Sequence, residues 1–478
     1  MGLAAAAGSV VVYAILALSG DLRQNLPVFL GGWAALAGLY LMGLVALRRT
    51  RPTRAALAFV LAAGALFRAE LLLARPSLSD DVHRYVRDGW VQVHGINPYA
   101  AAPDDPALAS LRLPDHALIN NPSIPTIYPP GAQALFAAAA FVRPSPAFFK
   151  VLFVLFDLAA MLFLAGWLRR RGRNPLGVAV YAWHPLAVVE VAGSGHVDGV
   201  GAFLLALAIV AIIGGRKIAS SVALGAAMAV KIVPVLAVPF FVRRWNALHI
   251  AVCAGLLVLA AAPYARSSQG RFFEGFGEYA TRWEFNGALY PLIEEGIDRL
   301  QPQEALRSTA ARVRRLVNDE AGWLVPPDRW LESPRLARIV AALAFAACLL
   351  AIALRNSAPE REVFAGLGAA LLLSPTVHPW YLLWILPLLV LLGAGPRMRN
   401  PGPGHPRRSI PGPSHPLAWS GTAWLWLTLA VPLSYLAYAS AGSVVPVWVR
   451  GAEYLPMIPL ALWERAAGKR GWFSEETP

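Results

Sequence analysis

Residues 55–90 read AALAFVLAAGALFRAELLLARPSLSDDVHRYVRDGW. The first part, residues 55–74, is an apolar run of the length that an α-helix needs to cross a lipid bilayer. The second part, residues 79–90, contains three aspartates, two arginines and a histidine, although charged residues make up only 15% of the chain. A dense polar stretch directly after an apolar run predicts a functional loop at the surface of a membrane.

Apolar runs of this kind recur from one end of the chain to the other. The 478 residues are 57% hydrophobic, whereas soluble domains contain about 45–50% apolar residues. The runs are continuous, so they indicate spanning helices rather than the alternating strands of a membrane barrel. We therefore predict an all-α polytopic membrane protein, with about 12–14 transmembrane helices in a single domain over residues 1–478.

The basic residues predict the orientation of these helices. The net charge of +14 is assigned to the positive-inside rule rather than to nucleic-acid binding, because the basic residues fall mostly in short loops. The arginines of residues 48–54 place that loop in the cytoplasm. Both chain termini are then cytoplasmic, and residues 75–149 and 264–335 form long external loops. A Pro/Gly/Arg-rich stretch, residues 396–417, predicts a flexible cytoplasmic loop.

Two short helices are expected in the first external loop. Ser79 is placed to cap a helix that Gly95 and Asn97-Pro98 end. Its two sides are apolar (Val82, Val86, Trp90 and Val93) and polar (Asp81, Arg84, Tyr85 and Asp88). This pattern predicts a short amphipathic helix that lies on the membrane surface. Residues 131–142 are apolar but too short to span, and they predict a second interfacial or re-entrant helix.

Residues 218–242 allow two interpretations. One long span would place Arg243 and Arg244 outside. Two short segments that break near Lys231 would keep these arginines inside and bring Lys231 to the outer side. We prefer the two short segments because they agree with the positive-inside rule.

With this topology, four polar clusters share the outer face. They are Asp80/Asp81, His196/Asp198, Arg282/Glu284 and His378. Each cluster has a purely structural alternative, such as a helix cap, a polar turn or an interfacial anchor. Adjacent carboxylates that are desolvated beneath the spans should raise each other's pKa, which suits the abstraction of a proton.

These residue types suit group transfer from an anionic donor that is linked to a lipid. Lys231, Arg282 and His378 are predicted to hold a phosphate at the membrane surface. A lysine within an apolar stretch is functional by default, although snorkelling is the structural alternative. The sequence has no zinc spacing, phosphate-binding glycine loop or dinucleotide fingerprint, and Cys253 and Cys348 lie in apolar runs.

Four passages, in this order over residues 75–390, resemble a known superfamily. They are Asp80-Asp81 with Arg84-Tyr85, Asp88-Gly89 and Gly95-Ile96-Asn97-Pro98-Tyr99; Thr126-Ile127-Tyr128-Pro129-Pro130; Trp183-His184-Pro185 through Gly195-His196-Val197-Asp198-Gly199 to Lys231-Ile232-Val233-Pro234; and Ser374-Pro375 with His378-Pro379-Trp380-Tyr381. Together they resemble the GT-C superfamily of membrane glycosyltransferases, and most closely the bacterial polyprenol-phosphate-mannose-dependent mannosyltransferases. Two departures are the extra spans ahead of the aspartate loop and the arginine-rich segment 299–335, which looks like a local insertion.

The resemblance implies a mechanism and a location. A catalytic aspartate of the first external loop is the general base of a direct, inverting displacement, and basic residues of the outer loops hold the leaving lipid phosphate. We therefore predict a glycosyltransferase of the bacterial inner membrane whose site faces the periplasm or exterior. It moves a sugar, most commonly mannose, from a polyprenyl phosphate to a hydroxyl of a lipid-linked or cell-envelope glycan. No metal or other cofactor and no nucleic acid is expected.

The predicted site residues fall into three groups. The base is Asp80 or Asp81: helix geometry favours Asp81, and the family habit of placing the base at the start of the loop favours Asp80. The donor phosphate is assigned to Lys231, Arg282 and His378. The sugar or acceptor pocket is assigned to Arg84, Tyr85, Asp88, Asn97, Tyr128, His196 and Asp198. The alternative function is a transporter or flippase for lipid-linked sugars, which predicts charged residues in the middle of spans and paired broken helices.

Overall fold

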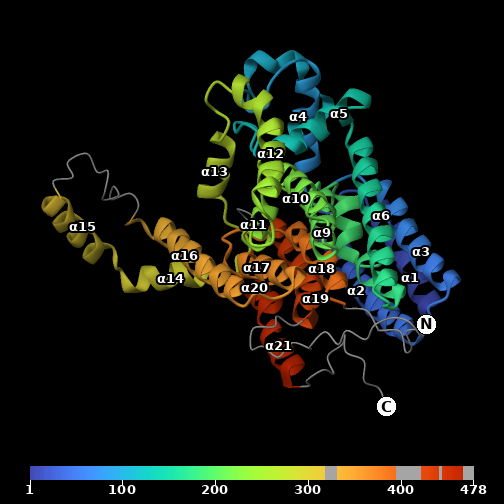
Figure 1. The fold of residues 1–478 in the computed structure, drawn as a ribbon. Coiled ribbons are helices and arrows are strands. Elements are labelled where there is room, and N and C mark those ends of the chain that lie inside the picture. The colour runs from blue at the N-terminus through green and yellow to red at the C-terminus, as the bar shows by residue number, and fades with distance from the viewer. Residues whose placement is uncertain (318–330, 394–420, 441–443, 467–478) are drawn as a thin grey trace.

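The computed structural model describes residues 1–317, 331–393, 421–440 and 444–466. In these ranges the regular structure is helical, and the only sheet-like pairing is a pair of isolated bridges from Phe285 and Asn286 to Thr376. Figure 1 shows a bundle of long helices with α4 and α5 at one end and the amino terminus at the other. The prediction of an all-α fold is confirmed.

Several of these helices are long and apolar enough to cross a membrane. In the described residues there are six: α2 (Leu26–Arg49), α3 (Arg54–Leu72), α6 (Pro146–Arg170), α12 (Ala247–Ser267), α16 (Ser333–Leu354) and the combined α19 and η8 (Gly421–Ala439). A pair of helical segments, Pro175–Ala182 and Pro185–Gly193, meets the same criteria together but bends by 55° at His184. The pair comprises η3 (Pro175–Val178), α7 (Ala179–Ala182), α8 (Pro185–Ala187) and η4 (Val188–Gly193).

The other predicted spans correspond to shorter helices. Apolar helices of 10–17 residues are α1 (Gly2–Leu18), α5 (Pro130–Val142), α9 (Asp198–Ile213), α10 (Lys217–Val230), η5 with α11 (Val233–Val242) and η7 with α18 (Pro379–Leu391). The remaining helices of these regions are α17 (Pro359–Leu373), α20 (Val447–Tyr454) and α21 (Met457–Ala466). A multi-pass helical membrane protein is therefore confirmed, whereas the number of 12–14 spans and their orientation stay predictions.

The polar stretch that follows residues 55–74 forms α4 (Asp81–Val93). Asp80, rather than Ser79, occupies the cap position, and the Ser79 hydroxyl accepts a hydrogen bond from the backbone N–H of Asp81 at 3.3 Å. Nine of its thirteen residues are buried within the protein, and its place on a membrane surface stays a prediction. The chain between α4 and α5 contains the short helices η1 (Pro106–Leu111) and η2 (Pro114–Leu118), and η2 packs against α4. This loop covers the polar face that the sequence pattern assigned to water.

Helix α5 lies directly against α4. A Cβ atom on Gly89 would lie 2.2 Å from the carbonyl oxygen of Phe136, so only glycine permits this approach of the two backbones. With 13 residues, α5 is about 20 Å long, which is too short to cross a bilayer. The prediction of a short second helix in this loop is confirmed.

The break at Lys231 is present. Helix α10 ends at Val230, and Lys231 adopts an extended backbone conformation (φ −145°, ψ 150°) before η5 (Val233–Ala237) and α11 (Val238–Val242) begin. Arg243 and Arg244, which follow α11, each form an ion pair with buried Glu362 of α17 at 2.7 Å. The two short segments that we preferred are therefore correct, and this break positions Lys231 for the site.

The second long loop is also helical. It contains α13 (Glu274–Arg282), α14 (Tyr290–Leu300) and α15 (Gln303–Val317). Helix α14 packs on α16 through Tyr290, Ile297, Ala337 and Ala341. Figure 1 shows α15 projecting away from the helix bundle. The loop predicted at residues 396–417 lies outside the described residues.

Candidate active site

The two neighbouring aspartates at the start of α4 have different partners. Asp80 accepts two hydrogen bonds from the guanidinium of Arg23, at 2.9 and 3.2 Å, and Arg23 also lies over the ring of Tyr438 at 4.5 Å. Arg23 belongs to the turn between α1 and α2. Asp80 therefore connects the start of α4 to the turn between α1 and α2.

Asp81 points into a different environment. Its side chain is 14% exposed, and its oxygens accept hydrogen bonds from Tyr85 and Asn120, each at 3.4 Å. Burial raises the pKa of Asp81, and the nearby charge of Lys231 opposes this effect. The side chain is a carboxylate with few donors and a small opening, which suits a general base.

Lys231 lies beside a fully buried partner. Its Nζ is 3.0 Å from Oδ2 of Asp198, whose Oδ1 accepts a hydrogen bond from the Trp384 indole at 3.0 Å. The ammonium also lies over the ring of Tyr128, 5.2 Å from its centre. The Lys231 side chain is 14% exposed, so the cation is held in place but can still be reached.

Four aromatic and imidazole rings form one stack beside this pair. His196 stacks on Trp380 at 4.0 Å, Trp380 on His378 at 4.3 Å, and His378 on Phe285 at 4.6 Å. Burial, together with the charge of Lys231, lowers the pKa of both imidazoles, and that of His378 falls to about 3. Both rings are therefore neutral at physiological pH and can each donate one hydrogen bond.

His196 connects Asp81 to a residue that the sequence analysis did not select. Its Nδ1 is 3.8 Å from Oδ2 of Asp81, and its Nε2 is 3.4 Å from Oε2 of Glu190. Glu190 belongs to η4 and is fully buried, and its Oε1 accepts a hydrogen bond from the Tyr435 hydroxyl at 2.8 Å. The sequence could have pointed to Glu190, because it is a single glutamate in an otherwise apolar run and such residues are rare within spans.

Comparison with family models shows the class of the protein. Residues 3–247 match the model described as alpha-(1->6)-mannopyranosyltransferase, N-terminal domain, and residues 126–379 match glycosyltransferase family 87. The chain belongs to these glycosyltransferase families. Each match covers more than half of the 478 residues, and the two overlap over residues 126–247, which contain His196 and Lys231. A search of curated proteins finds no match.

Other predicted pocket residues of the glycosyltransferase have structural partners. Asp88 is fully buried and accepts hydrogen bonds from Arg84 at 3.0 Å, Arg87 at 3.1 Å and Gln133 at 3.2 Å. Arg84 also donates to the carbonyl of Ile124 at 2.7 Å. This network joins α4 to α5 and to the covering loop, so it supports the site from behind Asp81.

Asn97 has a comparable structural position. Its amide donates to the carbonyl of Tyr264 at 2.7 Å and to the hydroxyl of Ser267 at 2.9 Å. These contacts tie the end of the α4 region to α12. The structure therefore gives Asn97 partners in α12 rather than in the Asp81 cluster.

Arg282 is the last residue of α13 and is largely exposed. Its side chain is 73% exposed and forms an ion pair with Glu278, one turn earlier in α13, at 2.7 Å. The neighbouring Glu284 binds Arg338 at 2.9 Å and accepts a hydrogen bond from Tyr290 at 3.1 Å. The structure thus brings Asp81, Lys231, His196, Asp198 and His378 together but leaves Arg282 on the outside.

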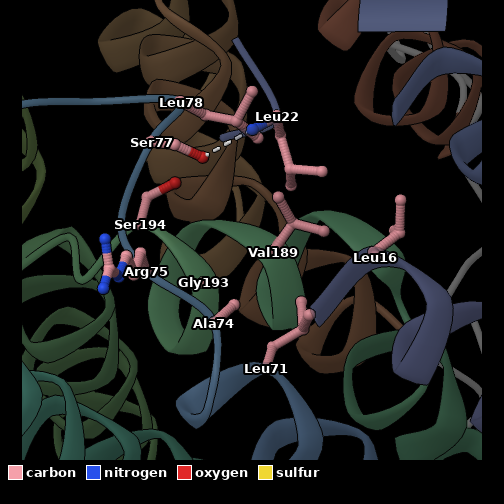
Figure 2. A pocket seen from close by; sticks show the side chains of 10 residues that line it. All are labelled: Leu16, Leu22, Leu71, Ala74, Arg75, Ser77, Leu78, Val189, Gly193 and Ser194. Atoms are coloured by element: carbon pink, nitrogen blue, oxygen red, sulfur yellow. Dashed lines mark hydrogen bonds between the residues drawn. The ribbon is translucent and has the colours of Figure 1, made fainter. Parts of the chain in front are cut away.

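A small, mostly apolar recess adjoins η4 on another side. Figure 2 shows its lining: Leu16, Leu22, Leu71, Ala74, Arg75, Ser77, Leu78, Val189, Gly193 and Ser194. The Ser77 hydroxyl accepts a hydrogen bond from the backbone N–H of Leu22 at 3.0 Å. No member of the Asp81 cluster lines the recess, so the residues suited to chemistry lie elsewhere.

A metal site is not formed by the part of the chain that the structure describes. There, no three His, Cys, Asp or Glu side chains are grouped as metal ligands. Independence from metals stays a prediction.

Proposed function

We propose that this glycosyltransferase moves a sugar, mannose, from a polyprenyl-phosphate donor to a hydroxyl of a lipid-linked or cell-envelope glycan. The reaction takes place on the outer face of the bacterial inner membrane and inverts the anomeric centre. One observation carries the proposal: a carboxylate, Asp81, and a cation whose charge acts on it, Lys231, are each 14% exposed, in the described residues of a chain from two glycosyltransferase families.

Asp81 is the general base of the proposed reaction. The acceptor oxygen attacks the anomeric carbon, the bond from that carbon to the phosphate oxygen breaks, and the phosphate leaves with the electron pair. The acceptor proton goes to a carboxylate oxygen of Asp81. Because a single displacement attacks the face opposite the leaving group, the configuration inverts. The raised pKa of Asp81 makes it a stronger base than an exposed aspartate.

Lys231 and His378 are assigned to the donor phosphate. The ammonium stabilises the negative charge that grows on the leaving phosphate, and a neutral imidazole can donate a hydrogen bond to it. Asp198 holds Lys231 at 3.0 Å, so little reorganisation is needed when the phosphate arrives. Arg282 stays a prediction for the same role, although its partner here is Glu278. These groups supply the charge stabilisation, so the proposed reaction needs no metal.

The transporter alternative rests on charged residues inside spans, and the described residues contain one fully buried ion pair between two spans. Arg68 of α3 and Asp157 of α6 form a fully buried ion pair, and Tyr181 donates to the same carboxylate. Arg68 also donates to the backbone carbonyls of Gly64 and Ala182. These partners join three helices to one another, so the pair supports helix packing, and family membership supports a transferase.

The test is transfer of labelled mannose from synthetic mannosyl polyprenyl phosphate by the purified protein. We expect Asp81→Asn to lower the rate by about 10²–10⁴-fold. Asp80→Asn should retain much more activity, because an asparagine oxygen can still accept a hydrogen bond from Arg23. Equal activity of Asp81→Asn and the unaltered protein would exclude Asp81 as the base. Movement of the intact donor across proteoliposomes without any sugar transfer would favour the transporter.

A further inference from the structure

Glu190, His196 and Asp81 form a line of groups that the proposed reaction does not yet explain. Each ring nitrogen of His196 faces one carboxyl oxygen. Nδ1 is 3.8 Å from Oδ2 of Asp81, and Nε2 is 3.4 Å from Oε2 of Glu190. Stacking on Trp380 restrains the ring, so its nitrogens stay directed toward these two side chains. In the described part of the chain, both nitrogens and Oε2 of Glu190 are buried and make no hydrogen bond.

Three buried polar atoms without a hydrogen bond are unusual at one place, because buried polar atoms are nearly always paired. Catalytic hydrogen bonds are often long in an empty site and shorten when the substrates bind. A movement of less than about 1 Å would bring both contacts of His196 into the hydrogen-bonding range. The line therefore has the geometry of a base supported by an imidazole, which in turn is held by a second carboxyl group.

The tautomer of His196 follows from the role of Asp81. A base must be ionised before it reacts, and an ionised carboxylate only accepts hydrogen bonds. The useful hydrogen of a neutral imidazole is then on Nδ1, which faces Asp81, so Nε2 must accept one from Glu190. Burial and the charges around it lower the pKa of His196 and favour this neutral ring. Tyr435 donates to Oε1 of Glu190 at 2.8 Å, which leaves Oε2 to carry the hydrogen toward Nε2.

We propose that Glu190 is a positioning residue that holds His196 in the tautomer whose Nδ1–H points to Asp81. The inference rests on the proposed role of Asp81 as the general base. His196 orients the carboxylate toward the acceptor hydroxyl and stabilises its ionised form. Glu190 touches neither substrate and acts only through His196, in the same way that outer residues fix the tautomer of histidines in other sites.

The experiment compares two substitutions at this position with a matched control. Glu190→Leu removes the hydrogen bond to Nε2. Glu190→Gln keeps it, because Tyr435 orients the amide oxygen at Oε1 and leaves the amide N–H₂ facing Nε2. Glu453→Leu removes another fully buried glutamate, whose partner is Asn286 at 2.6 Å. It therefore measures the effect of losing a buried carboxyl group elsewhere in the protein.

We expect Glu190→Leu to lower kcat by about 10–100-fold with little change in the KM for the donor. The acid limb of the pH profile should move to higher pH, because Asp81 loses a hydrogen bond that favours its charged form. Glu190→Gln should retain most of kcat and an unshifted limb, as should Glu453→Leu. The charged or titratable groups that act on this line are Asp81, Tyr85, Tyr128, Glu190, Asp198, Lys231, His378 and Tyr435.

A measurement without substrate separates this inference from the proposed function. A hydrophobic carbodiimide reacts with protonated carboxyl groups, so the pH midpoint of Asp81 labelling, read by mass spectrometry, follows its protonation. We expect the midpoint to rise in Glu190→Leu and to stay in place in Glu190→Gln. An unshifted midpoint and full kcat in Glu190→Leu, or a Gln variant as impaired as the Leu variant, would overturn the role of Glu190. Absence of transfer from polyprenyl-phosphate donors by the unaltered protein would instead overturn the proposed function.

Discussion

The ion pair of Lys231 and Asp198 allows stability and activity to be separated. Lys231→Met removes the ammonium 3.0 Å from a carboxylate that is fully buried. Trp384 still donates to Oδ1 of Asp198, but a single neutral hydrogen bond cannot replace a cation. Removing one partner of a buried ion pair costs about 3–5 kcal/mol, because the other charge is left uncompensated. We therefore expect Lys231→Met to lower the unfolding temperature of the purified protein clearly.

The double variant Lys231→Met with Asp198→Asn tests the origin of this loss. Asparagine keeps an oxygen for the Trp384 indole and carries no charge, so most of the stability should return. Activity should not return, because the proposed cation for the donor phosphate is still absent. We expect both variants to lose about 10²–10³-fold in kcat, measured as transfer of labelled sugar, while their unfolding temperatures differ.

Two results would refute this reasoning. An unchanged unfolding temperature in Lys231→Met would show that Asp198 does not depend on this cation. Full sugar transfer by the double variant would show that Lys231 does not act on the phosphate. Asp198→Asn alone is the matched control, because it leaves a lysine that is 14% exposed and can be partly solvated. It should therefore destabilise the protein less than Lys231→Met does.

Three further outcomes are expected. Burial raises the pKa of Asp81, so its base form is lost at a higher pH than that of an ordinary aspartate. As the pH is lowered, kcat/KM should therefore begin to fall at a higher pH than an ordinary aspartate would give. Arg23→Gln should lower the unfolding temperature and reduce transfer by less than Asp81→Asn, since Arg23 holds only Asp80 and the start of α4. Gly89→Ala should destabilise the protein by about 1–3 kcal/mol, seen as a lower unfolding temperature, because its Cβ would lie 2.2 Å from the Phe136 carbonyl oxygen.

The helices and the break at Lys231 could be predicted because their causes are local. Apolar runs of spanning length, arginines at one end of them and a lysine followed by Pro234 within an apolar stretch each have a physical meaning without any tertiary contact. The burial of α4 had no such local cause. Its polar face would suit water, but Asp88 also accepts a hydrogen bond from Gln133, which only the packing of α5 against α4 brings there, beside the local donors Arg84 and Arg87 of α4 itself.

The choice between Asp80 and Asp81 also depended on the fold. Their positions differ by one residue, and the pattern of α4 alone could not show where the residue before the helix points. Arg23 settles the direction of Asp80, although it lies 57 residues away in the chain. The same limit applied to Arg282, whose place in a predicted outer cluster gave no information on its distance from Asp81. Sequence position predicts the side of the membrane, whereas the partners of a side chain require the packed structure.

Asp80 and Asp81 are connected to each other through contacts with residues near the carboxyl end of the chain. Arg23, which binds Asp80, lies over Tyr438, and Tyr438 stacks on Tyr435 at 5.6 Å. Tyr435 donates to Glu190, which faces His196 and through it Asp81. This series of contacts therefore begins at Asp80 and ends at Asp81, the next residue of the chain. Its middle lies in η8 (Val431–Ala439), beyond residue 379, where the second family match ends.

Through these contacts η8, which lies far along the sequence, supports Asp80 and Asp81 near its beginning. A movement of η8 would change both the docking of α4 at Asp80 and the support of Asp81 through Glu190. Tyr435→Phe removes only the hydroxyl that orients Glu190, so it should reproduce part of the pH shift of Glu190→Leu with little loss of stability. Tyr438→Phe keeps the ring beneath Arg23 and should leave the pH profile of transfer unchanged. If Tyr438→Phe shifted the pH profile and Tyr435→Phe did not, Asp81 would not be supported through Tyr435 and Glu190.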